Sequence, residues 1–204
     1  FAMLSTISQY ATRLHQMAEK FLWYSKTHLY TESVRRGLPG SAAQEAIESA
    51  ASEKAAQMFR PDDLIIEIEQ AEIQMVDECL QKIVIELVEN AFKFSSPGKK
   101  VTVQGRVQED EYVLKVIDYG RGMTREQIDL IGGFMQFERS IQEQQGTGLG
   151  LIISRRLVEI FDGKFSVHSV PDRGTIISIR LPCKVVAGAV PAQTDEKPVT
   201  SMRL

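Results

Sequence analysis

Two pairs of alternating runs place the strongest constraint on how this chain folds. In 100–107 (KVTVQGRV) and 112–120 (YVLKVIDYG), apolar and polar residues alternate on either side of the acidic turn 108–111. The runs 163–170 (GKFSVHSV) and 174–182 (GTIISIRLP) repeat this pattern around a Pro-Asp-Arg turn. A period of two is typical of strands with one buried face, and a short polar turn between two such runs predicts an antiparallel hairpin. We therefore predict a sheet that contains two hairpins.

Helical periodicity covers most of the remaining chain. Apolar residues at spacings of three and four predict helices over about 1–30, 42–58, 73–94 and 149–161, and residues 62–69 predict one more strand. Helices grouped against hairpins, without alternating βαβ units, favour an α/β fold of two layers. We expect a mixed, mostly antiparallel sheet packed against helices, preceded by a long N-terminal helix.

The domain organisation follows from changes in composition. Residues 35–41 (RRGLPGS) contain two glycines and a proline and are expected to be a linker. The linker separates the helix of residues 1–34 from a domain over residues 42–183. Residues 184–204 are small, polar or proline without periodicity, so we expect a disordered tail.

Composition excludes several classes of protein. A hydrophobic fraction of 43% with 25% charged residues is ordinary for a globular protein, and a net charge of −3 gives no sign of a nucleic-acid binder. Cys79 and Cys183 are far apart and lack a CxxC spacing, which favours buried thiols in a reducing compartment. No stretch approaches the roughly 20 apolar residues of a membrane span. We expect a cytoplasmic chain that contacts neither nucleic acid nor membrane.

Gly146, Gly148 and Gly150 alternate with other residues directly before a predicted helix. A dinucleotide-binding fold needs GxGxxG after a strand, whereas these glycines are spaced GxGxG after a polar run. A Walker loop is excluded because residues 151–154 supply no lysine. Two interpretations remain open. The glycine amides at the helix N-terminus could hold the phosphates of a nucleotide under a lid, or the loop could bind nothing.

Three motifs decide between these interpretations. The segments ELVENAFKF, DYGRGM and GTGLGL, in this order, resemble the N, G1 and G2 boxes of the ATP-binding domain of two-component sensor histidine kinases. The resemblance covers about residues 60–182, including the lid segment QFER and the run PDRGTIISIRLP. It implies the histidine kinase ATPase fold, shared with gyrase, chaperone and mismatch-repair ATPases. Residues 1–34 resemble the second helix of the dimerisation and phosphotransfer hairpin.

The N box has a chemical interpretation. Glu86, Asn90 and Lys93 are spaced i, i+4 and i+7 and therefore share one face of a helix. The amide oxygen of Asn90 suits Mg²⁺, and the ammonium of Lys93 suits phosphate oxygens. The resemblance assigns the magnesium ligand to Asn90. Glu86 stands where many sensor kinases have Asn and where related ATPases have a water-orienting Glu, so it is expected to polarise water or the attacking group. Phe94 is expected to form a wall of the base pocket.

The G1 box ends a strand with a carboxylate. A buried Asp118 needs a donor, and the exocyclic amino group of adenine is one. The resemblance assigns this contact to Asp118, with Thr175 in support. Gly120 and Gly122 stand where the chain must turn tightly. In the long polar segment that follows, Phe134 and Phe137 are expected to pin the base of a lid, and Arg139 is expected to contact the γ-phosphate.

The complete prediction for the site follows from the resemblance. The expected catalytic residues are Glu86, Lys93 and Arg139. The expected ATP-binding residues are Asn90, Lys93, Phe94, Asp118, Gly120, Gly122, Met123, Phe137, Gly146, Thr147, Gly148, Leu149, Gly150 and Thr175. The expected cofactors are ATP and Mg²⁺.

The sequence departs from the family in its histidines. The family phosphorylates a histidine on the first hairpin helix, usually one followed by Glu or Asp. His15 precedes Gln16, His28 precedes Leu29, and His168 lies in a predicted strand. We therefore expect no phosphoacceptor in this chain.

The expected function is transfer of the ATP γ-phosphoryl group to a histidine on a hairpin domain. The expected partners are that hairpin, as a homodimer in the full-length protein, and the receiver domain of a response regulator. Two alternatives remain: an ATPase that drives a conformational change, and a non-catalytic nucleotide-sensing module.

Overall fold

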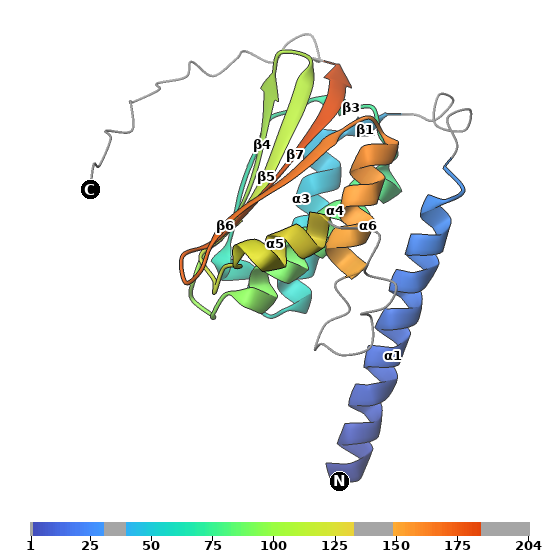
Figure 1. Cartoon of the computed structure of the whole chain (residues 1–204), viewed down its shortest axis with the longest axis vertical. Coiled ribbons are helices and arrows are strands. Elements are labelled where there is room, and N and C mark those ends of the chain that lie inside the picture. The colour runs from blue at the N-terminus through green and yellow to red at the C-terminus, as the bar shows by residue number, and fades with distance from the viewer. Residues whose placement is uncertain (1, 31–39, 133–148, 185–204) are drawn as a thin grey trace.

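The computed structural model describes residues 2–30, 40–132 and 149–184, and within these ranges a curved sheet packs against helices (Figure 1). The helices are α1 (Ala2–Thr27), α3 (Ala43–Gln57), α4 (Asp77–Phe94), α5 (Arg125–Gly132) and α6 (Leu149–Ile160), with a 3₁₀ turn at Pro61–Asp63. The strands are β1 (Ser41–Ala42), β2 (Leu64–Ile68), β3 (Glu72–Ile73), β4 (Val101–Gln108), β5 (Glu111–Asp118), β6 (Lys164–Val170) and β7 (Gly174–Lys184). The predicted tail and most of the predicted linker and lid lie outside these residues.

The sheet is mixed and mostly antiparallel, as predicted. Its strand order is β1-β3-β7-β5-β4-β2, and β6 also pairs with β7. Within the described strands, only β2 and β4 run parallel. Both predicted hairpins are present as the pairs β4–β5 and β6–β7, and each turn contains a non-glycine residue with positive φ, Glu109 and Asp172. The α/β fold in two layers is confirmed.

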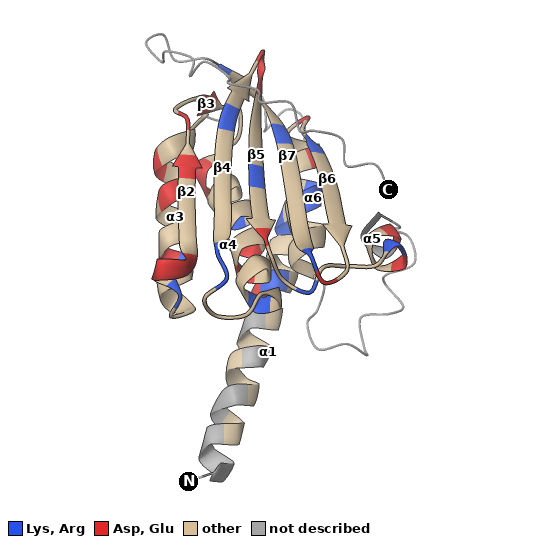
Figure 2. Ribbon diagram, turned by 90° about the vertical axis from the view of Figure 1, so that its left-hand side faces the viewer, with Lys and Arg blue, Asp and Glu red and all other residues tan. Residues whose placement is uncertain are grey.

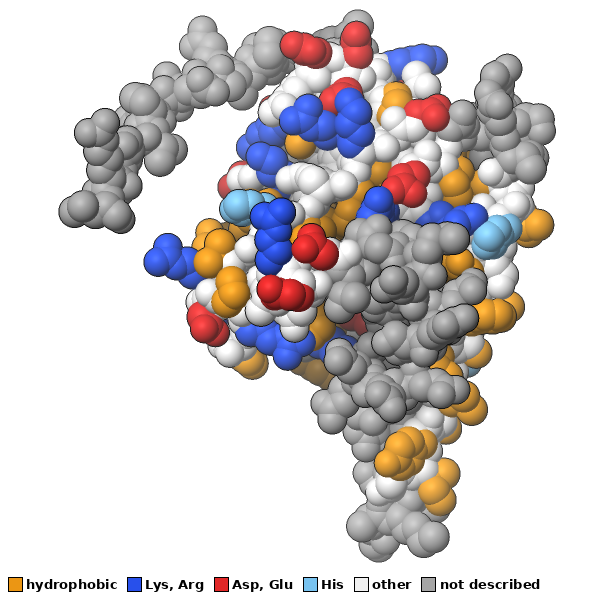
Figure 3. Space-filling model, viewed as in Figure 1, with side chains coloured by type: hydrophobic (Ala, Val, Ile, Leu, Met, Phe, Trp, Pro, Cys, Tyr) orange, Lys and Arg blue, Asp and Glu red, His pale blue; other side chains and the backbone are white. Residues whose placement is uncertain are grey.

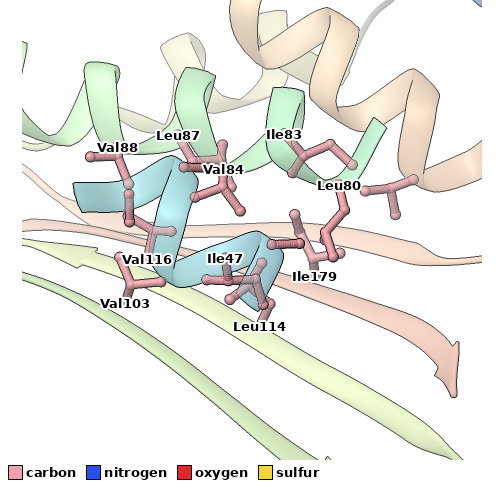
Figure 4. Close-up of a cluster of buried hydrophobic side chains, with 14 of the residues drawn as sticks. Ile47, Leu80, Ile83, Val84, Leu87, Val88, Val103, Leu114, Val116 and Ile179 are labelled. Atoms are coloured by element: carbon pink, nitrogen blue, oxygen red, sulfur yellow. The ribbon is translucent and has the colours of Figure 1, made fainter. Parts of the chain in front are cut away.

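The core lies between one face of the sheet and helices α3, α4 and α6. Apolar residues of α4 recur every three to four positions and pack onto inward-facing strand residues (Figure 4). The labelled members of this cluster are Leu80, Ile83, Val84, Leu87 and Val88 of α4, Ile47 of α3, and Val103, Leu114, Val116 and Ile179 of the strands. Figure 2 shows the sheet from its opposite face, with Lys and Arg positions marked on several strands and α3, α4 and α6 behind the sheet. The alternation in the sequence therefore reflects a sheet with one covered face.

The helix predicted over 73–94 begins later, at Asp77. Glu72 and Ile73 form the short strand β3, which pairs with the end of β7, and the N–H of Gln74 donates to the carbonyl of Pro182 at 3.0 Å. Val76 is also extended, with φ −71° and ψ 145°. Pairing with a distant strand therefore overrides the local apolar spacing at the start of this segment.

Arg60 caps the C-terminal end of α4. A helix leaves its last carbonyls without intrahelical partners. The guanidinium of Arg60 donates to the carbonyls of Phe92 and Ser95 at 2.9 Å each, and to those of Ser96 and Lys99 at 2.8 and 2.9 Å. Its Nε lies 2.7 Å from the carboxylate of Asp63. One side chain therefore holds the end of α4 and the loop after it, next to the candidate site.

Among the described residues, the long helix α1 contacts the rest of the protein toward its C-terminal end, mainly at α6 (Figure 1). Lys20 Nζ lies 3.0 Å from Glu86 Oε2 and 3.4 Å from Glu89 Oε1, both on α4. Further along α1, Trp23 and Tyr24 pack against the core. The contact is thus part ionic and part apolar.

The N-terminal part of α1 projects from the body with apolar side chains in solvent (Figure 3). Among the side chains that the structure describes on this helix, the exposed large hydrophobic ones are Ile7, Tyr10, Leu14, Met17, Phe21 and Leu22. Among the helices that the structure describes, none combines the length and the apolar character needed to cross a membrane.

Replacing Lys20 by Met is expected to weaken the α1 contact more than replacing Lys26 by Met. Lys26 pairs with Glu78 at 2.6 Å in an exposed ion pair, and its Nζ lies 4.7 Å from the centre of the Trp23 ring, so its loss should cost about 0.5 to 1.5 kcal/mol. Loss of Lys20 removes a partner of the buried Glu86 and should cost about 1.5 to 3 kcal/mol. Trp23 is the only tryptophan, so its fluorescence during denaturant titration measures both values. Equal losses would contradict the prediction.

Candidate functional site

Asp118 ends β5 with a carboxylate that is only 9% exposed. The N–H of Gly120 donates to its Oδ1 at 2.8 Å. Burial raises the pKa of Asp118, while the backbone N–H groups of Gly120 and Thr175 oppose this rise by stabilising the charged form. The result is a buried acceptor at a strand end, suited to a ligand that donates hydrogen bonds.

Asp118 belongs to a polar row across three strands. It pairs directly with Thr175 on β7, and Thr175 pairs directly with Ser169 on β6. Directly paired residues share a face of the sheet, and this row lies on the helix-covered face. Asp118 and Thr175 were both predicted for the site. Ser169 was not, although a serine at an inward position of an alternating run was a signal that could have been used.

The G1 loop after Asp118 fits closely against its neighbours. A Cβ on Gly120 would overlap the backbone carbonyl of Phe94, and one on Gly122 would overlap that of Val170. Gly122 also has a φ of 64°, which disfavours other residues. The N–H of Met123 donates to Ser169 Oγ at 2.9 Å. The loop therefore lies between the end of α4 and the β6–β7 turn.

Phe94, the predicted wall of a base pocket, is the last residue of α4 and is 36% exposed. Its carbonyl accepts a hydrogen bond from the N–H of Arg121 at 3.1 Å. The guanidinium of Arg121 lies 4.4 Å from the centre of the Phe94 ring, and Lys93 Nζ lies 5.4 Å from it. Two cations thus lie over the Phe94 ring, and their positive charge favours an anionic ligand near this end of α4.

The predicted polar face of α4 runs from the interior to the surface. Glu86 is 1% exposed, Asn90 is half-buried and Lys93 is exposed. Lys82 Nζ lies 2.8 Å from Glu86 Oε1, and Lys20 approaches the other oxygen. Glu86 is therefore held by two cations inside the protein, whereas Lys93 is exposed.

Gly150 lies in the first turn of α6 and packs against this carboxylate. A Cβ there would overlap Glu86 Oε2 and would lie 3.6 Å from Asn90 Nδ2. Leu149, the first residue of α6, is 8% exposed. The described part of the G2 box thus contacts the N box directly. Gly150 makes room for Glu86, a contact that the sequence did not predict.

Several predicted site residues cannot be placed. Outside the described residues lie Phe134, Phe137, Arg139, Gly146, Thr147 and Gly148. The three boxes therefore meet at α4 through Phe94, Asn90 and Gly150, and the lid between G1 and G2 remains a prediction.

Asn90 fits the magnesium that the family implies. Within the described ranges, no group of three or more His, Cys, Asp or Glu residues could hold a metal by itself. Mg²⁺ commonly binds through one or two protein oxygens together with phosphates and water. Asn90 is half-buried, its amide group lies near the start of α6, and its side chain can supply one such oxygen.

The three histidines lie away from these residues. His15 is exposed on α1, 3.5 Å from Glu19, and His168 is exposed on β6. His28 Nδ1 lies 3.1 Å from a guanidinium nitrogen of Arg156.

Comparison with known proteins gives a consistent result. A family model described as "Histidine kinase-, DNA gyrase B-, and HSP90-like ATPase" matches residues 75–185. An uncharacterized sensor-like histidine kinase of Rhizobium meliloti is 33% identical over 131 residues, which are 63% of this chain and 25% of that protein. Sporulation kinase D of Bacillus subtilis is 28% identical over 110 residues, 54% of this chain and 21% of that protein. The chain thus spans a quarter or less of the length of these relatives.

Solved structures show the same fold. The mycobacterial sensor histidine kinase MprB superposes with a TM-score of 0.59 at 23% identity, covering 72% of this chain and 99% of that one. At such identity the likeness establishes the fold alone. The three boxes follow one another in the sequence and come together around α4. Because the family model also covers more than half of the chain, this chain belongs to the histidine kinase-, DNA gyrase B- and HSP90-like ATPases.

Proposed function

We propose that this chain is the ATP-binding catalytic part of a sensor histidine kinase that transfers the γ-phosphoryl group of ATP to a histidine on a dimerisation hairpin. The observation that carries the proposal is the buried carboxylate of Asp118 beside Thr175, at the strand end where the G1 loop meets α4. This carboxylate accepts a hydrogen bond from the exocyclic amino group of adenine. The names of the relatives, a sensor-like histidine kinase and a sporulation kinase, support the same activity.

The remaining roles concern phosphates and metal. Asn90 holds Mg²⁺ together with the triphosphate, and Lys93 neutralises phosphate charge from the same face of α4. Arg139 and the glycines Gly146 and Gly148 close over the γ-phosphate from the lid. Phosphoryl transfer depends mainly on such positioning and charge neutralisation.

The environment of Glu86 favours phosphoryl transfer over ATP hydrolysis. A carboxylate that orients an attacking water needs access to that water. Glu86 is 1% exposed and lies between Lys20 and Lys82. We therefore assign to Glu86 a structural role, in place of the catalytic role expected from the sequence.

The partners follow from the missing acceptor. The exposed apolar side chains on α1, among them Ile7, Leu14 and Phe21, pair with the other helices of a hairpin in a homodimer. The acceptor histidine belongs to the first helix of that hairpin. A receiver domain of a response regulator then takes the phosphoryl group in the cytoplasm.

Asp118→Asn is expected to weaken ATP binding about tenfold to hundredfold, because a hydrogen bond to a charged group contributes about 1.5 to 3 kcal/mol. Titration calorimetry measures the affinity. Asp110→Asn is the matched control, since Asp110 is exposed in the β4–β5 turn. The wild-type affinity should also fall toward acidic pH, because burial raises the pKa of Asp118 and its protonation removes the charged acceptor. A folded Asp118→Asn protein with unchanged affinity would remove Asp118 from the site.

Asn90→Ala is expected to abolish the dependence of nucleotide affinity on Mg²⁺. Asn90 is the only asparagine in the chain, and alanine supplies no oxygen ligand. Asn90→Asp is the control, because its carboxylate keeps a metal-binding oxygen at the same position. Affinities measured with and without Mg²⁺ give the result. If alanine and aspartate respond to Mg²⁺ equally, Asn90 is not the ligand.

The isolated chain is expected to bind ATP without labelling itself. Transfer requires a nucleophile within about 3 to 3.5 Å of phosphorus. None of the three histidines is followed by the Glu or Asp that usually follows the acceptor histidine in the family. With γ-labelled ATP, acid-labile phosphate should form only on an added hairpin domain that carries the acceptor. Asp118→Asn should suppress this labelling. Self-labelling that His15→Gln abolishes would make His15 the acceptor and contradict our assignment of α1.

A further inference from the structure

Ser169 interrupts an apolar pattern where the polar row crosses the sheet. On β6, the inward residues before it are Phe165 and Val167, which pair with Ile179 and Ile177 of β7. At the next inward position Ser169 pairs with Thr175. The rows before it are apolar, whereas this last row consists of Ser169, Thr175 and Asp118. A serine here gives up apolar burial, so its hydroxyl is expected to serve another purpose.

The hydrogen bonds around Ser169 determine the direction of its hydroxyl. The N–H of Met123 donates to Ser169 Oγ at 2.9 Å. The carbonyl of Gly174 lies 2.8 Å from Oγ and has no hydrogen, so the hydroxyl hydrogen of Ser169 points to this carbonyl. Thr175 Oγ1 lies 2.9 Å from Ser169 Oγ. Because the hydrogen of Ser169 is already used, Thr175 must donate in this contact.

The direction of the Thr175 hydroxyl changes what the site can bind. Once its hydrogen points to Ser169, Thr175 Oγ1 has only lone pairs left for a ligand or a bridging water. The neighbouring carboxylate of Asp118 also only accepts when ionised. Two adjacent acceptors attract a donor and repel a carbonyl oxygen.

We propose that Ser169 is a specificity-determining positioning residue, which keeps Thr175 as an acceptor and thereby selects 6-amino purines over 6-oxo purines. The inference rests on the proposed function, because it concerns the base of the bound nucleotide. Ser169 acts through Thr175 and is not placed in contact with the nucleotide. Without Ser169, the Thr175 hydroxyl can rotate and donate to an oxo group.

The test compares ATP with inosine 5′-triphosphate, which differs from ATP only along the purine edge that includes position 6. Calorimetry gives the ratio of the two affinities. In the wild type, mismatched acceptors should make ATP bind at least about tenfold more tightly. Ser169→Ala should reduce this ratio severalfold, whereas Ser169→Thr, which keeps the hydroxyl, should retain most of it.

Ser166→Ala is the matched control. Ser166 lies on the same strand but is exposed on the opposite face, with a 3.3 Å contact to the carbonyl of Ser178. Its removal should leave the ratio unchanged. Loss of discrimination in both alanine variants would mean that β6 is merely destabilised, which would overturn the proposal.

A double-mutant comparison tests the route through Thr175. In a Thr175→Val background, Ser169→Ala should leave the ratio of affinities unchanged, since no hydroxyl remains to be oriented. A similar change in both backgrounds would show that Ser169 does not act through the Thr175 hydroxyl and would overturn the proposal. If Ser169→Ala does not fold, Ser169→Cys, a weaker hydrogen-bonding group of similar shape, takes its place in both backgrounds.

The outcomes separate this inference from the proposed function. A wild-type chain that does not bind ATP contradicts the proposed function. A wild-type chain that binds ATP and discriminates against the inosine nucleotide, with a folded Ser169→Ala variant that discriminates equally well, contradicts only the inference.

Discussion

The arrangement of the helices depends on the pairing of the buried Glu86 carboxylate with two lysines. A charge removed from water must be paired, and Glu86 is paired by Lys20 of α1 and Lys82 of its own helix. It also requires the absence of a side chain at Gly150 of α6. Helices α1, α4 and α6 thus meet at the carboxylate of Glu86, which lies one turn of α4 before Asn90. The candidate site and the docked helix therefore share a structural element.

Local patterns predicted the fold where the local and the long-range preferences agree. Both hairpins were predicted because one covered face of a sheet imposes a period of two. The start of α4 was placed too early because the apolar spacing of Ile73 and Met75 suits a helix as well as a buried strand. Pairing of Ile73 with Cys183, more than a hundred residues later, decides the outcome. Helix α5 and strand β1 were missed because they are short and their patterns are weak.

The site was predicted where one residue type carries the chemistry by itself. Asp118 was expected to be buried at a strand end and is 9% exposed there. Ser169 and Lys20 were not assigned in this way, because each contacts a partner that lies elsewhere in the chain. Glu86 has the right position in its motif, but its two lysine partners become visible only once the helices are packed. The residues of the lid remain predictions.

Because α1 is attached near one end, a small rotation there moves its other end by a larger distance. The ionic contact begins at Lys20, so the preceding residues, Ala2–Glu19, extend about 27 Å beyond it at 1.5 Å per residue. A tilt of about ten degrees at the attachment would move the far end by about 5 Å, which is nearly one helical turn. A small shift at the contact between Lys20 and Glu86 would thereby become a larger displacement at the other end of the helix.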